Sequence, residues 1–470
     1  MPAPAELANR LAEADQAHVV AFWDELDASA RRRLEEQLSS IDLRRLRDLF
    51  DSHVAKQSGT IDSAGAVEQA AGPKDMVRQP KSQDEFDEWN RSARVGEELL
   101  SAGKVGAILV AGGQGTRLGF HKPKGMFQIG PVSGASLFQI LAEQVLARVR
   151  RAGRDIPYYV MTSDATHQDT EEFFRLNRYF GLDRENVFFF KQGNMPAIDA
   201  ATGKLLLAEK GSLALSPDGH GGILAALKAS GALDDMARRG IEYLHYHQVD
   251  NPTAIVCDPA FLGWHALHDS EISTKVVAKL TPSEKMGVVC DVAGKAQIIE
   301  YSDLPDELAD KRDESGNPIF WAGNTAIHVL SRSFLERLCD GEHDLPFHIA
   351  HKKVPFVDPH GNAVEPAAPN AFKFERFIFD ALPLATKALV VEADRQREFN
   401  PVKNAEGADS PATAKAALDR IGKQWLRAAG CDVAEDVTVE ISPLFALDEA
   451  EAARKIQPRT RYEGAVYLTG

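Results

Sequence analysis

The feature that most constrains this chain is an apolar, strand-like run that ends in a glycine-rich turn. Residues Val105–Val110 are almost entirely apolar, as expected for a strand buried on both faces of a parallel sheet. The turn that follows contains Gly112, Gly113, Gly115 and Gly119. Glycines allow positive φ and close approach of the backbone, and their N–H groups can point at phosphate oxygens. The pattern predicts a loop that binds the phosphates of a nucleotide.

The charges around this turn favour the same interpretation. Arg117, Lys122 and Lys124 bring three cations into a short segment. Leu99 to Ala142 contains neither Asp nor Glu, although the chain has 69 of them among 470 residues. At that frequency about six or seven would be expected in such a segment. The turn is therefore interpreted as an anion-binding site within an acidic protein.

Composition excludes several classes of partner. A net charge of −15 argues against binding to nucleic acid or to an anionic membrane. The four cysteines are far apart and form no C-x-x-C pair, so neither a zinc cluster nor a disulfide framework is expected. No apolar run approaches the ~18 residues of a membrane span, and the N-terminus lacks the pattern of a secretion signal. We expect a cytoplasmic protein with small-molecule substrates, and no pattern indicates its oligomeric state.

Apolar spacing divides the chain into four predicted parts, since single cores seldom grow beyond ~250–300 residues. Residues 1–54 show apolar side chains at three- and four-residue spacing, which predicts a helical N-terminal element. Residues 55–94, rich in Ala, Gly, Ser, Gln and Pro up to residue 82, predict a linker or strap. Residues 95–398 form the predicted catalytic domain, and 399–470 a small α+β C-terminal domain.

The central part alternates strand-like and helix-like segments. The strand-like segments are Val105–Val110, Tyr158–Thr162, Val187–Phe190 and Tyr243–Val249. Helical patterns at Leu137–Arg150 and Thr170–Tyr179 separate them. This alternation predicts an α/β fold with a doubly wound, mostly parallel, Rossmann-like sheet. Two strand-like segments, Gly287–Asp291 and Gln297–Tyr301, predict a hairpin inserted in the sheet.

Polar residues follow the predicted strands at the edge where open α/β sheets bind ligands. Gln192 follows one strand and Asp250 another, while a second glycine-rich loop, 217–222, precedes a helix that begins near Ile223. A carboxylate such as Asp250 can hold Mg²⁺ together with substrate phosphates. The alternatives are a helix-capping role for Asp250, or a metal site that it shares with His245 and His247.

The glycine-rich turn matches neither of two common nucleotide-binding motifs. It lacks the Lys-Ser or Lys-Thr of a P-loop and the G-x-G-x-x-G spacing of dinucleotide folds, so a purely structural turn remains an alternative. No Ser-His-Asp or Cys-His arrangement is evident either. Nucleotidyl transfer needs none, because a sugar phosphate is already an anionic nucleophile and catalysis consists of positioning and charge neutralisation.

Nine short motifs in one order identify a family resemblance. They read L-V-A-G-G-Q-G-T-R-L-G, P-K-G-M, K-Q-G-N-M-P-A, P-D-G-H-G-G, V-D-N, G-V-V-C, I-I-E-Y-S, A-G-N and P-V-K-N. Their order resembles the eukaryotic-type UDP-N-acetylhexosamine pyrophosphorylases of the UDP-sugar pyrophosphorylase family, over nearly the whole chain. The resemblance implies a nucleotidyltransferase that converts UTP and N-acetylglucosamine 1-phosphate to UDP-N-acetylglucosamine and pyrophosphate, with Mg²⁺ as cofactor.

Position by position, the resemblance implies three groups of site residues. The uridine would be held by Val110, Ala111, Gly112 and Gly113, and its uracil edge read by Gln192 and Gly219. The phosphates would be bound by the catalytic residues Arg117, Lys124 and Lys403, with Mg²⁺ on Asp250. The sugar would be bound by His220, Gly287, Glu300, Tyr301 and Asn324.

One residue departs from the family pattern. The acetylhexosamine enzymes usually have Asn where this chain has His220, whereas relatives that act on glucose have His in that loop. Glucose 1-phosphate or galactose 1-phosphate is therefore an alternative substrate, and a catalytically inactive UDP-sugar sensor is a third alternative. Phe377 and Phe379 are expected in the core, or in the lining of the sugar pocket.

Overall fold

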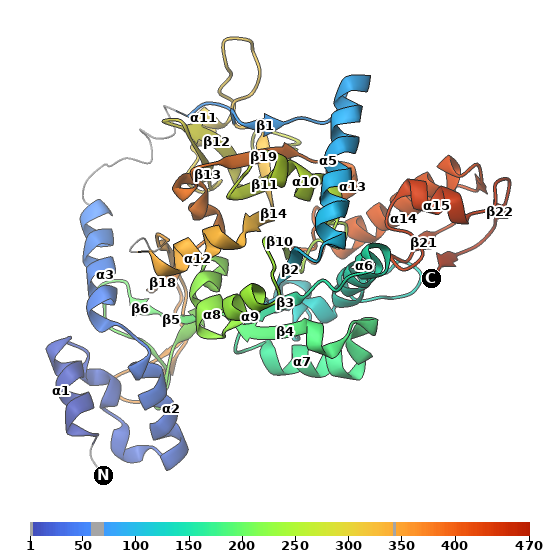
Figure 1. The fold of residues 1–470 in the computed structure, drawn as a ribbon. Helices are drawn as coiled ribbons and strands as arrows, with labels where there is room; N and C mark the ends of the chain where they lie inside the picture. The colour runs from blue at the N-terminus through green and yellow to red at the C-terminus, as the bar shows by residue number, and fades with distance from the viewer. Residues whose placement is uncertain (1–2, 58–69, 342–344) are drawn as a thin grey trace. The chain divides into compact units, whose positions relative to one another are not determined.

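The computed structural model describes residues 3–57, 70–341 and 345–470 (Figure 1). The chain is grouped in two compact units. Unit 1 comprises Met1–Gly65, Gln192–Ile223 and Leu345–Asp380. Unit 2 comprises Ala66–Lys191, Leu224–Asp344 and Ala381–Gly470. Among the described helices, none is both long and apolar enough to cross a membrane.

Unit 2 is built on a ten-stranded, mostly parallel sheet. Eight strands follow the order β1-β19-β11-β14-β10-β2-β3-β4, in which β14 alone runs antiparallel to its neighbours. They are β1 (Met76–Val77), β19 (Ala388–Glu392), β11 (Ile272–Ala278), β14 (Ala322–Ser331), β10 (Tyr243–Gln248), β2 (Val105–Val110), β3 (Tyr158–Thr162) and β4 (Val187–Lys191). The other two, β12 (Val288–Val292) and β13 (Lys295–Ile299), form a hairpin that joins β14. The predicted fold class is confirmed.

Helices cover both faces of this sheet. Tyr158 of β3 lies in a core cluster with α6 (Leu137–Ala152). The next residue, Tyr159, donates a hydrogen bond to Asp235 of α9 (Ala232–Arg238) at 2.9 Å. Because successive side chains of a strand point to opposite faces, α6 and α9 lie on opposite sides of the sheet. The sheet is therefore doubly wound, as predicted.

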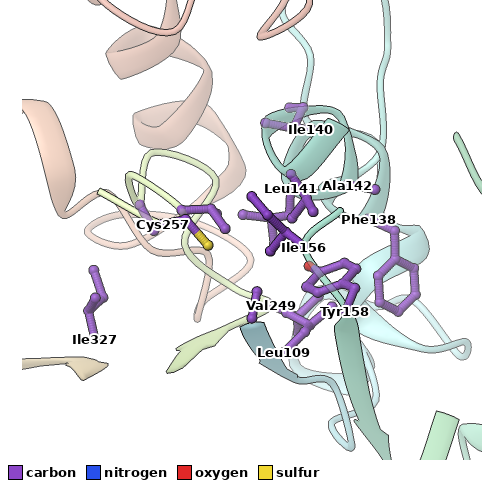
Figure 2. Close-up of a cluster of buried hydrophobic side chains, with 14 of the residues drawn as sticks. Leu109, Phe138, Ile140, Leu141, Ala142, Ile156, Tyr158, Val249, Cys257 and Ile327 are labelled. Atoms are coloured by element: carbon purple, nitrogen blue, oxygen red, sulfur yellow. The ribbon is translucent and has the colours of Figure 1, made fainter. Parts of the chain in front are cut away.

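The core between α6 and the sheet lies next to the strands that carry the candidate site. Figure 2 shows Leu109, Phe138, Leu141, Tyr158 and Val249 in one cluster, all of them buried. Burying a large apolar side chain contributes ~1.5–3 kcal/mol. Leu109 lies one position before the end of β2 and Val249 directly follows β10, so this cluster holds the ends of both strands in place.

Residues 83–94, which the sequence analysis placed in the linker, belong to helix α5 (Gln83–Ser101). A capping box between Ser82 and Glu85 starts this helix. It crosses α10 (Pro259–Leu267) so closely that a Cβ at Gly96 would lie 1.9 Å from the Pro259 carbonyl oxygen. The linker prediction is wrong for these residues, although the Ser82–Glu85 capping box is a local signal for the start of α5. Residues 58–69 of the predicted linker lie outside the described residues.

Unit 1 joins the N-terminal helices to a small sheet. Its helices are α1 (Ala5–Glu13), α2 (Ala28–Ser39) and α3 (Leu43–Gln57), and its three-stranded sheet has the order β15 (His348–Lys352), β18 (Ala371–Glu375) and β6 (Ile198–Asp199). Leu11, Leu34 and Phe50 of the helices share one buried cluster with Ile198 and Phe374 of the sheet. The predicted helical element thus has its core in common with strands from two later segments.

The C-terminal residues of unit 2 have a core of their own. Helix α14 (Pro411–Ala428) and the pair β21 (Val439–Ile441) and β23 (Val466–Leu468) contribute Trp425 and Val439 to it. The carboxylate of Glu440 accepts hydrogen bonds from the backbone of Val132 and Ser133, both at 2.7 Å. These bonds tie the C-terminal segment to the loop that follows the glycine-rich turn.

Three of the histidines buried in unit 2 are held in the neutral form. His245 and His247 of β10 and His265 of α10 are fully buried. Burial lowers the pKa of His247 and of His265 to about 3, and burial together with His247 and Lys275 lowers the pKa of His245 well below its usual range. They lie among core residues, and His247 stacks on Tyr158.

Lowering the pH from 7 to 5 is expected to reduce the free energy of unfolding. Each of these histidines titrates near pH 6.5 in the unfolded chain but at about 3, for His247 and His265, in the folded chain. The unfolded state binds more protons between these values, so stability is lost as the pH falls below 6.5. The loss reaches about 1.4 kcal/mol per pH unit for each histidine. Urea unfolding at a series of pH values measures it.

Two variants separate this effect from general acid sensitivity. His247→Phe keeps an aromatic ring against Tyr158 and removes one titrating group, so the slope of unfolding free energy against pH should be smaller by one proton. The matched control, His360→Gln, removes an exposed histidine. If the unfolding free energy of the two variants changed equally with pH between 6.5 and 5, the low pKa of His247 would be contradicted.

Candidate active site

Two neighbouring parallel strands deliver the central residues of the candidate site. In the pairing of β2 with β10, Val110 lies opposite Gln248, so the strands end at the same level of the sheet. Val249 donates a backbone hydrogen bond to Val110 at 3.0 Å. The glycine-rich turn and Asp250 therefore leave the sheet side by side, at its carboxyl edge.

Main-chain hydrogen bonds hold the glycine-rich turn. Gly115 donates to the carbonyl of Lys122 at 2.9 Å, and Lys124 donates to that of Gly113 at 3.0 Å. The expectation of positive φ holds for Gly119, at 68°, and is wrong for Gly112, Gly113 and Gly115. At Gly115 the physical reason for glycine is space, because a Cβ would lie 2.8 Å from the Phe120 carbonyl oxygen.

The turn leaves main-chain donors available at its start. Within the described residues, the N–H groups of Gly112 and Gly113 have no hydrogen-bond acceptor. A Cβ at Gly113 would meet no atom within 4 Å, so this part of the turn borders open space. The Gly112 carbonyl is held by the Ser163 hydroxyl at 2.8 Å. The N–H groups at the start of the turn are therefore left without an internal partner in the described part of the chain and lie beside open space.

The structure brings Lys124 and Asp250 together. The Lys124 ammonium lies 3.8 Å from the Asp250 carboxylate, and both side chains are mostly buried. Arg117 and Lys122, in contrast, are exposed. Of the three cations of the turn, Lys124 is therefore the one whose position the protein restricts most.

Lys403 is anchored beside Asp250 by the main chain. Val402 donates a hydrogen bond to the Asp250 carbonyl at 2.8 Å, which ties the segment before Lys403 to the end of β10. The Lys403 ammonium lies 5.4 Å from the centre of the Phe399 ring and 4.0 Å from the Asp409 carboxylate. Asp409 is a residue that the sequence analysis missed.

Three of the predicted sugar-binding residues also come together in unit 2. Asn324 of β14 donates a backbone hydrogen bond to the Gly287 carbonyl at 2.8 Å, and a Cβ at Gly287 would lie 2.7 Å from a Glu300 carboxylate oxygen. The Asn324 side-chain oxygen accepts a bond from Ala326, so its NH₂ group remains a donor. Tyr301 follows Glu300 and is 48% exposed, which is high for an aromatic residue.

Unit 1 carries the predicted uracil-reading residues. Gln192 is buried, and next to it the Gly193 carbonyl accepts a bond from Asp218 at 3.1 Å. Asp218 is buried against Arg376, with which it forms an ion pair at 3.1 Å. Burial raises the pKa of the Asp218 carboxyl although Arg376 opposes the shift. Sequence reasoning missed Arg376, for which no motif gave a signal.

The second glycine-rich loop depends on a glycine at position 219. Gly219 has φ 82° and ψ 167°, a region that side chains other than hydrogen disfavour. A Cβ there would lie 2.4 Å from the Arg376 carbonyl oxygen. The loop and the strand end at Arg376 therefore touch backbone to backbone.

His220 is held as a neutral hydrogen-bond donor. Its Nδ1 accepts a hydrogen bond from the Ile378 backbone at 3.2 Å, so in the neutral ring Nε2 carries the proton. Burial, together with the nearby His348, lowers the pKa of His220 to about 4. The ring stacks on Phe377, which is half-buried, while Phe379 is buried in the core.

A buried ion cluster links the loop that follows Asp250 to the helix that precedes Lys403. Lys275 of β11 is 1% exposed, and its ammonium contacts Asp258 at 2.6 Å and also Glu398. Burial alone would lower the pKa of Lys275, but Asp258 and Glu398 outweigh burial and raise it. The two acids come from the loop after β10 and from α13 (Arg395–Glu398), the helix before Lys403.

Amide side chains complete this support. Asn251 donates to the Glu398 carbonyl at 2.7 Å and accepts a bond from the Asn400 backbone at 3.2 Å. Asn400 in turn donates to the Thr253 hydroxyl at 2.9 Å. The loop after Asp250 and the segment before Lys403 are therefore one hydrogen-bonded structure. No sequence pattern predicted it, because its bonds join residues about 150 positions apart.

Among the described residues, no group of three or more His, Cys, Asp or Glu side chains is arranged to hold a metal ion. His245 and His247 lie in the core beside Tyr158, which counts against a metal site that they share with Asp250. Asp250 offers a single carboxylate, 3.8 Å from the Lys124 ammonium. That donor set fits Mg²⁺, which often binds through one or two carboxylates plus substrate phosphates.

A family model described as UTP–glucose-1-phosphate uridylyltransferase matches residues 62–410. The chain belongs to the UTP–glucose-1-phosphate uridylyltransferase family. Within this family, the chain is 38% identical to the UDP-N-acetylhexosamine pyrophosphorylase-like protein 1 of Homo sapiens, over 98% of this chain and 94% of the relative.

Two further relatives in the uridylyltransferase family are similar over most of their length. The UDP-N-acetylglucosamine pyrophosphorylase of Saccharomyces cerevisiae is 36% identical, over 92% of each chain. The crystal structure of the uridine diphosphate N-acetylglucosamine pyrophosphorylase from Trypanosoma brucei superimposes with a TM-score of 0.81 at 26% identity, over 98% of this chain and 97% of that chain.

Replacing the buried ammonium should destabilise this uridylyltransferase family member strongly. Lys275→Met leaves Asp258 and Glu398 without the ammonium that both contact, and breaking a buried ion pair costs about 3–5 kcal/mol. The free energy of unfolding from urea titration measures this loss. Adding Glu398→Gln to Lys275→Met should recover part of it, because one uncompensated charge is removed.

The matched control is Lys387→Met, which removes an exposed ion pair with Asp269. Exposed pairs contribute little, so this variant should unfold close to the parent. If Lys387→Met and Lys275→Met had the same effect, the central role of the buried cluster would be refuted.

Proposed function

We propose that the chain is a uridylyltransferase that converts UTP and N-acetylglucosamine 1-phosphate to UDP-N-acetylglucosamine and pyrophosphate. The observation that carries the proposal is the meeting of Lys124 and Asp250 at the ends of β2 and β10, with the Lys403 segment bonded to Asp250. The family relatives named above support it, since their names include this pyrophosphorylase in Saccharomyces cerevisiae and in Trypanosoma brucei.

The reaction is an in-line displacement at the α-phosphorus of UTP. An oxygen of the sugar phosphate forms the new bond, and the bond to the bridging oxygen breaks as pyrophosphate leaves with the electron pair. Lys124 and Arg117 would neutralise the β- and γ-phosphates, and Lys403 the α-phosphate and the sugar phosphate. The free N–H groups of Gly112 and Gly113 would hold the nucleotide, together with Val110 and Ala111.

Mg²⁺ is the proposed cofactor, and Asp250 would hold it. When bound, the ion supplies charge neutralisation on the phosphates. The Asp250 carboxylate also lies 3.8 Å from the Lys124 ammonium, so it orients a cation as well.

Base and sugar selection are assigned to other residues. Gln192 would pair with the N3–H and a carbonyl of uracil, a combination that cytosine does not offer. Gly219 would lie against the base, and His220, Gly287, Glu300, Tyr301 and Asn324 would bind the sugar. The Asn324 NH₂ donor suits an acetamido oxygen, which favours N-acetylglucosamine 1-phosphate over glucose 1-phosphate. A cytoplasmic location stays a prediction.

A panel of sugar 1-phosphates tests the proposed substrate. With UTP and Mg²⁺, pyrophosphate release should show kcat/KM at least ten-fold higher for N-acetylglucosamine 1-phosphate than for glucose or galactose 1-phosphate. A site that hydrogen-bonds a polar group discriminates against analogues that lack it. A preference for glucose 1-phosphate would support the alternative that His220 suggests, and no release with any sugar would indicate a sensor.

Lys124→Ala is expected to lower kcat by about 10²–10³, comparable to losing one preorganised transition-state donor. The matched control is Lys122→Ala, which removes an exposed cation two residues away and should keep the parent's kcat. Steady-state pyrophosphate release measures both. Equal turnover of the two variants would contradict the role of Lys124.

A further inference from the structure

Asp409 closes the loop that carries Lys403 by backbone hydrogen bonds. The carbonyl of Asp409 accepts backbone hydrogen bonds from Lys403 at 2.6 Å and from Asn404 at 3.0 Å. Asn404 also donates from its side chain to the Ala408 carbonyl at 2.9 Å. The carboxylate of the same Asp409 lies 4.0 Å from the Lys403 ammonium. Asp409 thus contacts Lys403 twice, at its backbone N–H and at its side-chain ammonium.

The backbone at Asp409 is unusual for a residue with a side chain. Its φ is 53°, in the left-handed region that favours glycine and that Asp and Asn tolerate better than other residues. The next residue, Ser410, caps helix α14 and forms a capping box with Thr413. The start of α14 fixes the position of Asp409, and a glycine there could adopt the same φ without strain. The carboxylate is therefore the feature that glycine would not supply.

The surrounding charges leave Asp409 as the partner of Lys403. The other acids near it are already engaged, since Glu284 pairs with Arg395 and Asp250 lies beside Lys124. Burial raises the pKa of the Asp409 carboxyl, while Lys403 lowers it and Glu284 raises it. Each of the two lysines assigned to the phosphates therefore has one carboxylate at about 4 Å. Contacts this long and partly exposed are open to exchange with a phosphate anion.

We propose that Asp409 is a positioning residue for Lys403 and the counter-ion that substrate phosphate displaces. This inference rests on the proposed function, because it concerns the lysine assigned to the α-phosphate and the sugar phosphate. The carbonyl of Asp409 fixes the backbone of Lys403, and the carboxylate of Asp409 holds the Lys403 ammonium near the proposed phosphate site. When a phosphate arrives, its oxygens replace the carboxylate beside the ammonium. The lysine is then already oriented for the transition state.

Asp409→Asn tests the carboxylate with little change to the backbone, because Asn also tolerates positive φ. The ammonium loses its orientation but also its competitor for phosphate. We therefore expect kcat to fall about five- to twenty-fold while KM for UTP stays the same or falls. Asp409→Gly, which fits φ 53° without strain, should give the same split. The matched control is Glu406→Gln, an exposed acid in the same loop, which should behave as the parent.

A double-mutant cycle shows whether Asp409 acts through Lys403. In a Lys403→Ala background, Asp409→Asn should have no further effect on kcat. Equal effects of Asp409→Asn in both backgrounds would overturn the proposal, as would parental kcat in Asp409→Asn and Asp409→Gly. So would a raised KM that accompanies a loss of thermal stability in both variants, since that result indicates a purely structural role.

Calorimetric binding of UTP separates this inference from the proposed function. Asp409→Asn should bind UTP as tightly as the parent or more tightly, whereas Lys403→Ala should bind it more weakly. A parent protein that releases no pyrophosphate would refute the proposed reaction, but the binding comparison would still decide the role of Asp409. Weaker UTP binding by Asp409→Asn, to the extent seen for Lys403→Ala, would refute the counter-ion role.

Discussion

The parallel pairing of β2 with β10 is the constraint on which the candidate site depends. Because Val110 lies opposite Gln248, the glycine-rich turn and Asp250 leave the sheet at the same edge. A slip of one residue would turn every side chain of β10 to the other face. His245 and His247 would then exchange places with Leu244 and Tyr246, and Asp250 would move away from Lys124. The buried cluster around Leu109 and Val249 holds the register that prevents this.

Polar groups in the interior reinforce that arrangement at a cost in stability. The Lys275 ammonium, fully buried between two carboxylates, joins strand β11 to the loops on both sides of the site. Apolar side chains of similar volume could stabilise the fold as well, but an ion cluster accepts few geometries. Hydrogen bonds from Asn251 and Asn400 extend the same control to Asp250 and to the segment of Lys403. The buried charges around Lys275 thus help to position the segments that carry Asp250 and Lys403.

In unit 1 a buried ion pair also holds a loop, and there the cation is an arginine. Asp218 and Arg376 hold the second glycine-rich loop, and Gly219 is required because the backbone of Arg376 lies against it. His220 is neutral at physiological pH, since its pKa is about 4, and its proton lies on Nε2. A neutral ring offers one donor in a fixed direction, which a protonated ring would not. The N-terminal helices share a buried cluster with the sheet of this unit.

The sequence by itself determined the fold class, the main strands and the order of the motifs. These features are local: Val105–Val110 is apolar throughout, the turn after it is rich in glycine, and the capping residues of α14, Ser410 and Thr413, are only three positions apart. Only the tertiary structure decided that Lys275 lies between Asp258 and Glu398, that Asp409 faces Lys403, and that residues 83–94 form part of a helix crossing α10. Glu398 and Lys275 are 123 positions apart, and their contact follows from how strands and loops stack in three dimensions. Local patterns specify which elements form, whereas long-range contacts between buried groups decide which side chains meet.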